Sequence, residues 1–221
     1  MKTDRRKFLF GAAAGAASLA APLRVAAQAA PDQRTRKIVD KAVSELARAA
    51  HAVSRRDVVA IADFGLHSSE PRFHIVNLEA GRMRSFLVTH GAGSDPEHDG
   101  WLNAFSNVNG SNATSRGAYV TEQLYHGKYG ASMRLEGLER DNSNAYSRAI
   151  VMHPATYATQ DFVNQHGRLG RSNGCFAMGD AEMTHTLNAL QGGTLLFADR
   201  LGIGPGGAQV QAPRQRNLNL G

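Results

Sequence analysis

The stretch GRLGRSNGCFAM, residues 167–178, holds the only cysteine of the 221-residue chain, Cys175. Three glycines in it, Gly167, Gly170 and Gly174, permit backbone conformations that other residues resist, so that amide N–H groups can converge beside the thiol. Such a turn can stabilise an oxyanion. A lone cysteine is, by itself, more often a small buried side chain without chemistry. The stretch therefore supplies a candidate nucleophile that the rest of the sequence has to support.

Residues 1–29 indicate export from the cytoplasm. The pair Arg5-Arg6 precedes an uncharged run rich in Ala and Gly from Phe8 to Leu23, the pattern of a twin-arginine signal peptide. This run is shorter than the ~20 residues that span a bilayer. We therefore expect it to be removed, with cleavage after Ala29 or two residues earlier, and we expect a mature protein without a membrane span in the periplasm or cell envelope.

The positive charge of the chain lies mainly in that signal. The formal net charge is +6, but residues 1–29 contain five basic residues and one acidic residue, so the mature chain carries +2. It contains no basic patch with interleaved aromatic residues, and we expect no nucleic-acid partner. The oligomeric state stays open. In an exported protein a leftover thiol cannot form an internal disulfide, which makes a reactive Cys175 as good an interpretation as a structural one.

The order of apolar patterns predicts a mainly β fold. Residues 34–53 repeat apolar positions at three- and four-residue steps, which predicts an amphipathic helix that packs on the domain or, alternatively, acts as a spacer to the envelope. We assign 30–56 to this helix and linker, 57–201 to a catalytic domain and 202–221 to a disordered tail. Strands are expected at 57–64, 73–78, 82–89, 118–125, 133–138, 149–153 and 195–198, and helices at 155–165 and 180–190. Without strict βαβ alternation, this order favours a mostly antiparallel β sandwich or barrel-like core with a few peripheral helices.

His153 is a candidate base for the thiol. It ends the strand expected at 149–153 and precedes a proline, which favours an extended conformation for the histidine. An adjacent imidazole lowers the pKa of a thiol and accepts its proton. Taken alone, a histidine at a strand end is better explained by structural hydrogen bonding, and His166, nine residues before Cys175, is a rival. Asn173 can orient a partner but cannot ionise.

Two further features frame the site. Residues 90–117 are rich in Gly, Ser, Asn and Asp and form a long loop, which usually carries function or covers a site. The sequence has neither a His-Glu-x-x-His helix nor a Cys-x-x-Cys pair. We therefore expect no metal site and no cofactor.

Several motifs, taken in order, resemble the catalytic domain of murein L,D-transpeptidases. They are RAIVMH at 148–153 and the stretch at 167–175, with HGAGSDP at 90–96, FSN at 105–107, YHGK at 125–128 and RLEGL at 134–138 upstream. The resemblance covers roughly residues 58–199. It implies a YkuD-type β-sandwich domain and acyl transfer on peptidoglycan stem peptides by a Cys/His pair.

The resemblance also implies roles for individual residues. Cys175 would be the nucleophile and His153 the base. Ser172, Gly174 and the amide of Cys175 would shape the oxyanion site, and Arg171 would contact a carboxylate of the substrate.

The turn departs from the family pattern at three positions. Asn173, which we place in the substrate-binding site, stands where the murein branch usually has Trp. Phe176 stands where it has Pro, and Pro154 follows the upstream histidine in place of Gly or Ser. These changes keep the nucleophile and the base. They leave undetermined the shape of the acceptor side of the pocket, and with it the balance between transfer and hydrolysis. We therefore expect an L,D-transpeptidase, with an L,D-carboxypeptidase or cross-link hydrolase and a non-catalytic wall-binding module as alternatives.

Overall fold

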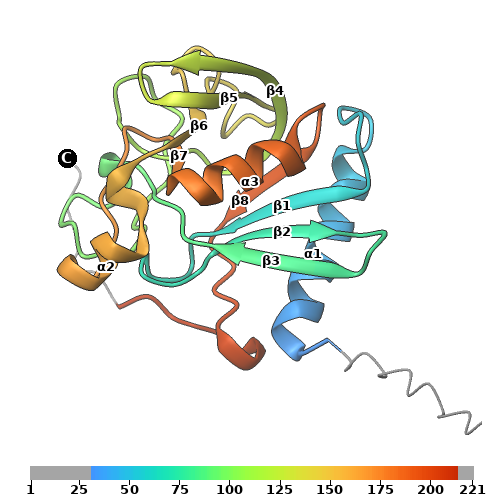
Figure 1. The fold of residues 1–221 in the computed structure, drawn as a ribbon, viewed down its shortest axis with the longest axis horizontal. Helices are drawn as coiled ribbons and strands as arrows, with labels where there is room; N and C mark the ends of the chain where they lie inside the picture. The colour runs from blue at the N-terminus through green and yellow to red at the C-terminus, as the bar shows by residue number, and fades with distance from the viewer. Residues whose placement is uncertain (1–30, 214–221) are drawn as a thin grey trace, which may run out of the picture. The chain divides into compact units, whose positions relative to one another are not determined.

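One eight-stranded sheet organises the chain in the computed structural model, which describes residues 31–213 (Figure 1). The strand order is β3-β2-β1-β8-β4-β5-β6-β7. The strands are β1 (Val58–Asp63), β2 (Phe73–Asn77), β3 (Arg82–Phe86), β4 (Gly117–Gly127), β5 (Gly130–Gly137), β6 (Val151–Pro154), β7 (Phe176–Met178) and β8 (Leu195–Asp199). The helices are α1 (Gln33–Ala49), α2 (Gln160–His166) and α3 (Asp180–Leu190).

Most neighbouring strands run antiparallel, and the exceptions are the pairs β1–β8 and β6–β7. The long strand β4 pairs with β8 through residues 117–120 and with β5 along most of its length. A register shift between Thr121 and Leu124 marks a bulge in the β4–β5 pair, and such bulges bend the strand that carries them. The predicted mainly β, mostly antiparallel fold is confirmed, in the form of a single curled sheet.

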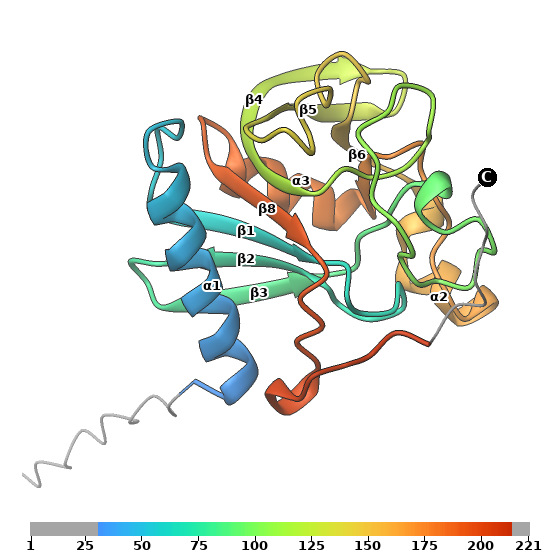
Figure 2. The same cartoon turned by 180° about the vertical axis from the view of Figure 1, so that it is seen from behind.

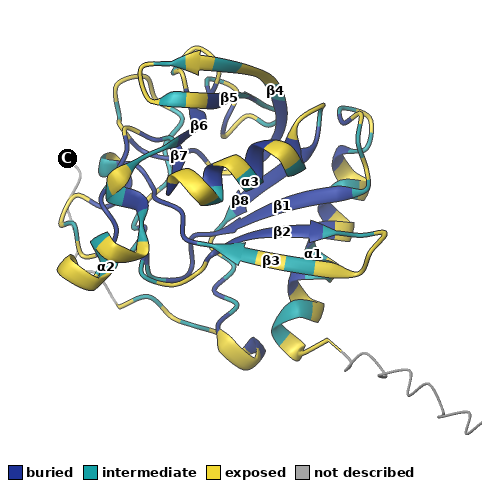
Figure 3. Ribbon diagram, viewed as in Figure 1, coloured by how far each residue is buried: buried dark blue, intermediate teal, exposed yellow. Residues whose placement is uncertain are grey.

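The sheet buries both of its faces, and β1 shows why. Its alternate residues point to opposite sides, as the two-residue period of a strand requires. Val58, Ala60 and Ala62 join the core beneath α3, whereas Val59 and Ile61 join the core beneath α1. The two helices cover opposite sides of the sheet in Figures 1 and 2, and β1 is buried throughout in Figure 3.

Helix α1 packs on the domain, as the amphipathic pattern predicted. Asp32 caps its first turn by accepting a hydrogen bond from the Thr35 N–H at 2.8 Å. Ile38 and Ala42 are fully buried against the sheet. The alternative of a detached spacer is therefore wrong, and the helix ends four residues earlier than predicted, at Ala49.

The C-terminal segment differs from the prediction, because residues 202–213 are ordered. Both oxygens of the buried Asp63 carboxylate accept backbone N–H groups of this segment, from Gly202 at 2.7 Å and from Ile203 at 2.8 Å. Lys37 of α1 donates to the carbonyl of Gly207 at 2.7 Å. A disordered tail from residue 202 is thus wrong for this part, since a buried carboxylate pairs with polar backbone groups that composition alone assigns to solvent.

Other expectations fall outside the described residues. The signal peptide at 1–29 and the end of the tail at 214–221 belong to this group. Within residues 31–213, none of the helices is both long and apolar enough to cross a bilayer.

Two elements around the turn were not anticipated correctly. The helix expected at 155–165 begins as a 3-10 turn, and α2 starts only after Thr159, whose hydroxyl accepts the N–H of Phe162 at 3.2 Å. The short strand β7 directly follows Cys175 and pairs in parallel with β6. Three residues after a glycine turn are too few to show a strand periodicity.

The packing of α1 leads to a stability prediction. Ile38→Ala should lower the free energy of unfolding by about 2–5 kcal/mol, because it leaves a cavity at a fully buried position. Val43→Ala, on the same helix but 50% exposed, is the matched control and should change it by less than about 1 kcal/mol. Urea unfolding of the two variants measures the difference, and equal midpoints would contradict the packing of α1.

Candidate active site

The turn before β7 is held by Ser172. Its hydroxyl accepts the N–H of Gly174 at 3.2 Å and donates to the carbonyl of Cys175 at 2.7 Å. Its backbone N–H donates to the carbonyl of His90 at 3.0 Å, and its carbonyl accepts the N–H of Ala92 at 2.8 Å. Ser172 therefore sets the shape of the turn with all of its polar groups, and its hydroxyl is already engaged.

Two glycines let three segments meet at this turn. Gly174 has a φ of +111°, and a Cβ there would lie 2.7 Å from the carbonyl oxygen of Ala113. A Cβ on Gly91 would lie 2.7 Å from the Cα of Gly174. The turn thus rests against residues 91 and 113 of the long loop, so this loop borders the turn that carries the cysteine.

Two backbone N–H groups of the turn remain available. The amides of Asn173 and Cys175 make no hydrogen bond within residues 31–213, whereas those of Ser172 and Gly174 do. The side chain of Asn173 is exposed. This arrangement offers adjacent donors beside the sulfur, which is what an oxyanion site needs.

His153 lies on the strand next to the cysteine. It pairs with Ala177 in the parallel β6–β7 ladder, and side chains two residues apart on a strand share a face. Cys175 stands two residues before Ala177, so the imidazole and the thiol project from the same side of the sheet. On the other side, Met152 and Phe176 belong to the hydrophobic core. The register therefore places the two predicted residues on one face of neighbouring segments, and their pairing as nucleophile and base stays a prediction.

One hydrogen bond of His153 determines which of its two ring nitrogens carries the proton. Nδ1 lies 2.9 Å from the carbonyl oxygen of Pro154, which can only accept, so Nδ1 carries the proton. Nε2 is then unprotonated and makes no hydrogen bond within the described chain. Tyr129 stacks on the imidazole with ring centroids 4.4 Å apart and an interplanar angle of 21°. The ring is thus held in place, and its Nε2 remains able to accept a proton.

The electrostatics of the thiol differ from the prediction. Burial raises the pKa of Cys175, and this outweighs the opposing effects of the Val151 N–H and of the nearby Arg148 and Lys128. The Sγ donates to the carbonyl of Ala149 at 3.6 Å. Burial also lowers the pKa of His153. Both shifts favour the neutral forms of the thiol and the imidazole, whereas a neighbouring histidine suggested a pre-formed thiolate.

Arg148, whose role the sequence did not reveal, organises the loop beside the sulfur. Its guanidinium donates to the carbonyls of Ser106 at 2.7 Å and Ala113 at 2.5 Å, and to the hydroxyl of Ser115 at 2.6 Å. The RAIVMH motif at 148–153 is the signal that could have revealed it. This side chain ties the long loop to the strand that carries His153.

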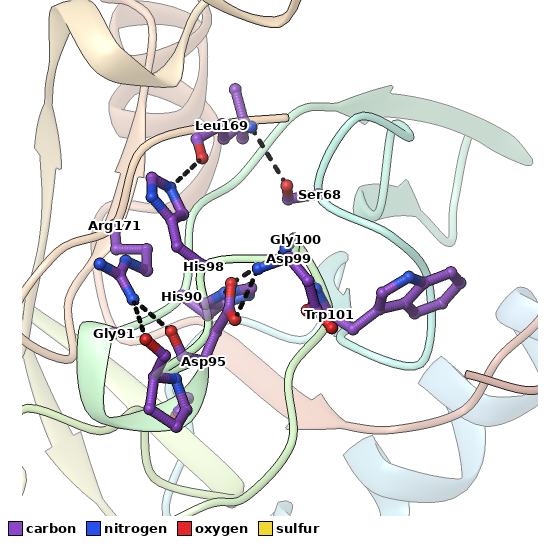
Figure 4. Close-up of polar contacts among 12 residues, drawn as sticks. Ser68, His90, Gly91, Asp95, His98, Asp99, Gly100, Trp101, Leu169 and Arg171 are labelled. Carbon is purple, nitrogen blue, oxygen red and sulfur yellow. Dashed lines mark hydrogen bonds and ion pairs between the residues drawn. The ribbon is translucent and has the colours of Figure 1, made fainter. Parts of the chain in front are cut away.

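Arg171 is engaged within the protein. Its Nη1 donates to the carbonyls of Asp95 and Pro96, the latter at 3.3 Å (Figure 4). These bonds join the turn to the loop that follows His90. The expected contact of Arg171 with a substrate carboxylate stays a prediction, but this cation already has carbonyl partners.

A buried polar chain supports the same loop. Arg72, fully buried, donates from Nη2 to Nδ1 of His90 at 2.8 Å. Nε2 of His90 donates to the Asp95 carboxylate at 3.1 Å (Figure 4). Asp95 also accepts the N–H groups of Asp99 and Gly100, both at 3.0 Å. Burial lowers the pKa of His90 to about 4. Burial opposes ionisation of Asp95, but these hydrogen bonds outweigh it and lower its pKa to about 2.

His166, the rival base, lies at the exposed C-terminal end of α2. Its ring packs on Phe162, with centroids 4.2 Å apart. It belongs to a helix end and not to the paired strands β6 and β7. The strand register therefore favours His153 as the partner of Cys175.

A comparison with family models identifies the domain. Residues 31–198 match the family model described as L,D-transpeptidase catalytic domain. The chain belongs to this family. The L,D-transpeptidase model covers α1 as well as the sheet, together with both Cys175 and His153. No curated protein matches the sequence.

Solved structures similar to this family member include L,D-transpeptidases from two mycobacteria. The one from Mycobacterium smegmatis is 12% identical, with a TM-score of 0.40 over 65% of this chain and 58% of that chain. The one from Mycobacterium tuberculosis H37Rv is 17% identical, with a TM-score of 0.39 over 65% and 57%. The helical cell shape determining protein from Campylobacter jejuni is 14% identical, with a TM-score of 0.41 over 77% and 57%. The chain therefore spans less than two thirds of the length of these structures.

The crowding at Gly174 leads to a paired test in this L,D-transpeptidase domain. Gly174→Val should lose both stability and thiol acylation, because its φ is +111° and its Cβ would approach the Ala113 carbonyl to 2.7 Å. Gly110→Val is the control, since its φ is +79° but nothing lies within 4 Å of its Cβ. The control should lose about 1–2 kcal/mol to backbone strain alone. Thermal unfolding and acylation by a carbapenem measure the two effects, and full acylation of Gly174→Val would contradict a role of the turn in the site.

The thiol environment predicts an unusual titration. The rate of Cys175 alkylation by iodoacetamide should rise with pH through an apparent pKa above the ~8.5 of a free thiol, because burial disfavours the thiolate. Rates measured from pH 6 to 11, with free cysteine as the reference, give this value. A midpoint well below that of the reference would show a resting thiolate–imidazolium pair instead.

Proposed function

We propose that this family member is an exported cysteine acyltransferase that acts on peptidoglycan stem peptides. The observation that supports this most directly is the placement of His153 and Cys175 on one face of paired strands, with the imidazole Nε2 unprotonated. Nε2 can then take the proton of the thiol when a substrate displaces the Ala149 contact. The thiolate formed in this way is the nucleophile.

In the first half of the reaction, Sγ attacks the carbonyl that joins the third stem residue to a terminal D-amino acid. The N–H groups of Asn173 and Cys175 are the free donors that would stabilise the oxyanion. As the C–N bond breaks, His153 returns the proton to the departing amine, which leaves as the free D-amino acid. The low pKa of the buried imidazole makes its protonated form a strong acid for this step.

In the second half, an amine of another stem peptide attacks the thioester. His153 takes a proton from that amine and returns one to the sulfur, which leaves a new amide bond and a free thiol. If water takes the place of the amine, the same steps give an L,D-carboxypeptidase or a cross-link hydrolase. The exposed amide of Asn173, where the murein branch usually has Trp, makes the acceptor side polar enough to admit water.

The location follows from the substrate. Peptidoglycan lies outside the cytoplasmic membrane, so an enzyme that modifies it has to be exported. The twin-arginine pattern at residues 1–29 fits this requirement. We therefore propose the periplasm or cell envelope as the site of action.

Purified stem tetrapeptide tests the proposed function. The mature protein should form a covalent adduct at Cys175, detected by intact-mass spectrometry, and then release either tripeptide by hydrolysis or a cross-linked dimer by transfer. Cys175→Ala should form no adduct. His153→Gln should slow adduct formation about 10²–10⁴-fold, as loss of a general base does, whereas the control His166→Gln should leave it unchanged.

Each outcome of this experiment has a distinct meaning. Turnover by Cys175→Ala would rule out the thioester, and a slow His166→Gln beside a normal His153→Gln would transfer the base to His166. A protein that stays unmodified by tetrapeptide and by carbapenem would be the non-catalytic wall-binding module.

A further inference from the structure

The inference concerns how the site recognises its substrate, and it rests on the proposed function. The terminal D-amino acid of a stem peptide carries a free carboxylate close to the bond that Cys175 would attack. A carboxylate in such a position is usually bound by a basic side chain. Arg148 and Lys128 act on the sulfur electrostatically, and Arg171 lies in the turn itself.

Both arginines are already committed to the protein framework. Arg148 donates to four oxygens of the long loop, two of them backbone carbonyls, at 2.5–3.2 Å. Arg171 donates to the carbonyls of Asp95 and Pro96. Turning either guanidinium toward a ligand would break bonds that hold the loop against the turn.

Lys128 has a different position. It lies at the tip of the β4–β5 hairpin, where Gly127 pairs with Gly130, and it is exposed. Its Nζ lies 4.7 Å from the centroid of the Tyr129 ring, which in turn stacks on His153. The ammonium is therefore held directly over the aromatic ring that covers the proposed base, with no carboxylate partner in residues 31–213.

The charge of Lys128 reaches both reacting groups. It lowers the pKa of Cys175, although burial raises that pKa by more. It also lowers the pKa of His153, in the same direction as the larger effect of burial. An anion bound at its Nζ would consequently lie within electrostatic range of the sulfur. The half-buried Arg134 lies over the rings of Tyr125 and Tyr146, at 4.7 and 5.5 Å from their centroids, and is not among the groups that shift the thiol pKa.

We propose that Lys128 binds the terminal carboxylate of the donor stem peptide and so selects peptides that end in a free D-amino acid. The hairpin tip places the ammonium over the Tyr129 ring that stacks on His153, while the arginines hold the loop against the turn. Lys128 is then a specificity-determining residue, and its contact sets which end of the peptide lies at the sulfur.

Peptide binding to a variant without the nucleophile tests the role of Lys128 directly. In a Cys175→Ala background, tetrapeptide with a free C-terminal carboxylate should bind at least about tenfold more tightly than the same peptide with a C-terminal amide. Adding Lys128→Met should weaken binding of the carboxylate peptide about ten- to a hundredfold, the range of a lost charged hydrogen bond. Binding of the amide peptide should change less than about threefold. Titration calorimetry measures all four affinities.

Two control variants keep the result specific. Lys128→Arg, which retains the charge, should keep most of the discrimination between carboxylate and amide. Arg134→Met removes a half-buried cation of the same hairpin and should leave the discrimination intact. If Lys128→Met weakens both peptides equally, or if Arg134→Met abolishes the discrimination, the assignment of Lys128 is overturned.

The wild-type enzyme provides the second measurement. Lys128→Met should raise KM for the carboxylate peptide more than it lowers kcat, because the contact is made in the bound substrate. A variant that loses only kcat would show that Lys128 acts on the sulfur and not on the carboxylate, and would overturn the inference. A wild-type protein that binds with the expected discrimination but forms no thioester would refute the proposed function while leaving the carboxylate site standing.

Discussion

The buried guanidinium of Arg72 is the constraint on which the site depends. Because it is fully buried, each of its nitrogens needs a partner, and it finds the carbonyls of Leu66 and Val88 and the Nδ1 of His90. This bond makes Nδ1 the acceptor, so Nε2 of His90 must be the donor to Asp95. Asp95 in turn caps the loop that Arg171 holds against the turn. One buried charge thus fixes the tautomer, the loop and, through them, the backbone beside the cysteine.

The turn itself contains little that would hold it in isolation. Ser172 closes it through its hydroxyl, but its outer contacts come from the long loop, at distances that only the absence of a side chain on Gly91 and Gly174 allows. In the proposed mechanism, the amides of Asn173 and Cys175, which make no hydrogen bond within residues 31–213, are therefore pre-oriented by this packing. Such pre-organised donors need no rearrangement when charge develops on the substrate. Gly174 affects both the stability of the fold and the shape of the proposed site. A substitution of Gly174 therefore needs a matched control that separates the two effects.

The sequence alone located the strands well, since apolar alternation and β-branched residues mark them, and it nominated Cys175 and His153. It could not show the order of residues 202–213, whose backbone is bound by Asp63 from 139 residues away in the chain. It also misjudged the thiol. A neighbouring histidine argues for a lowered pKa, but the sign depends on burial, which only the packing of the turn determines. The hydrogen bonds of Arg171 could not be predicted either, because its partners are backbone carbonyls of a loop that is distant in the sequence.

The raised pKa of Cys175 fits the location that we propose. Oxidation of a cysteine follows its thiolate fraction and its exposure, so a half-buried neutral thiol is protected in an oxidising compartment. The same protonation would make it a poor nucleophile if nothing relieved it. In the mechanism that we propose, His153 resolves this conflict, because its Nδ1 donates to the carbonyl of Pro154 and its Nε2 is left to take the proton. Reactivity then arises when a peptide excludes water and displaces the Ala149 contact, which confines the thiolate to the moment when there is a carbonyl for it to attack.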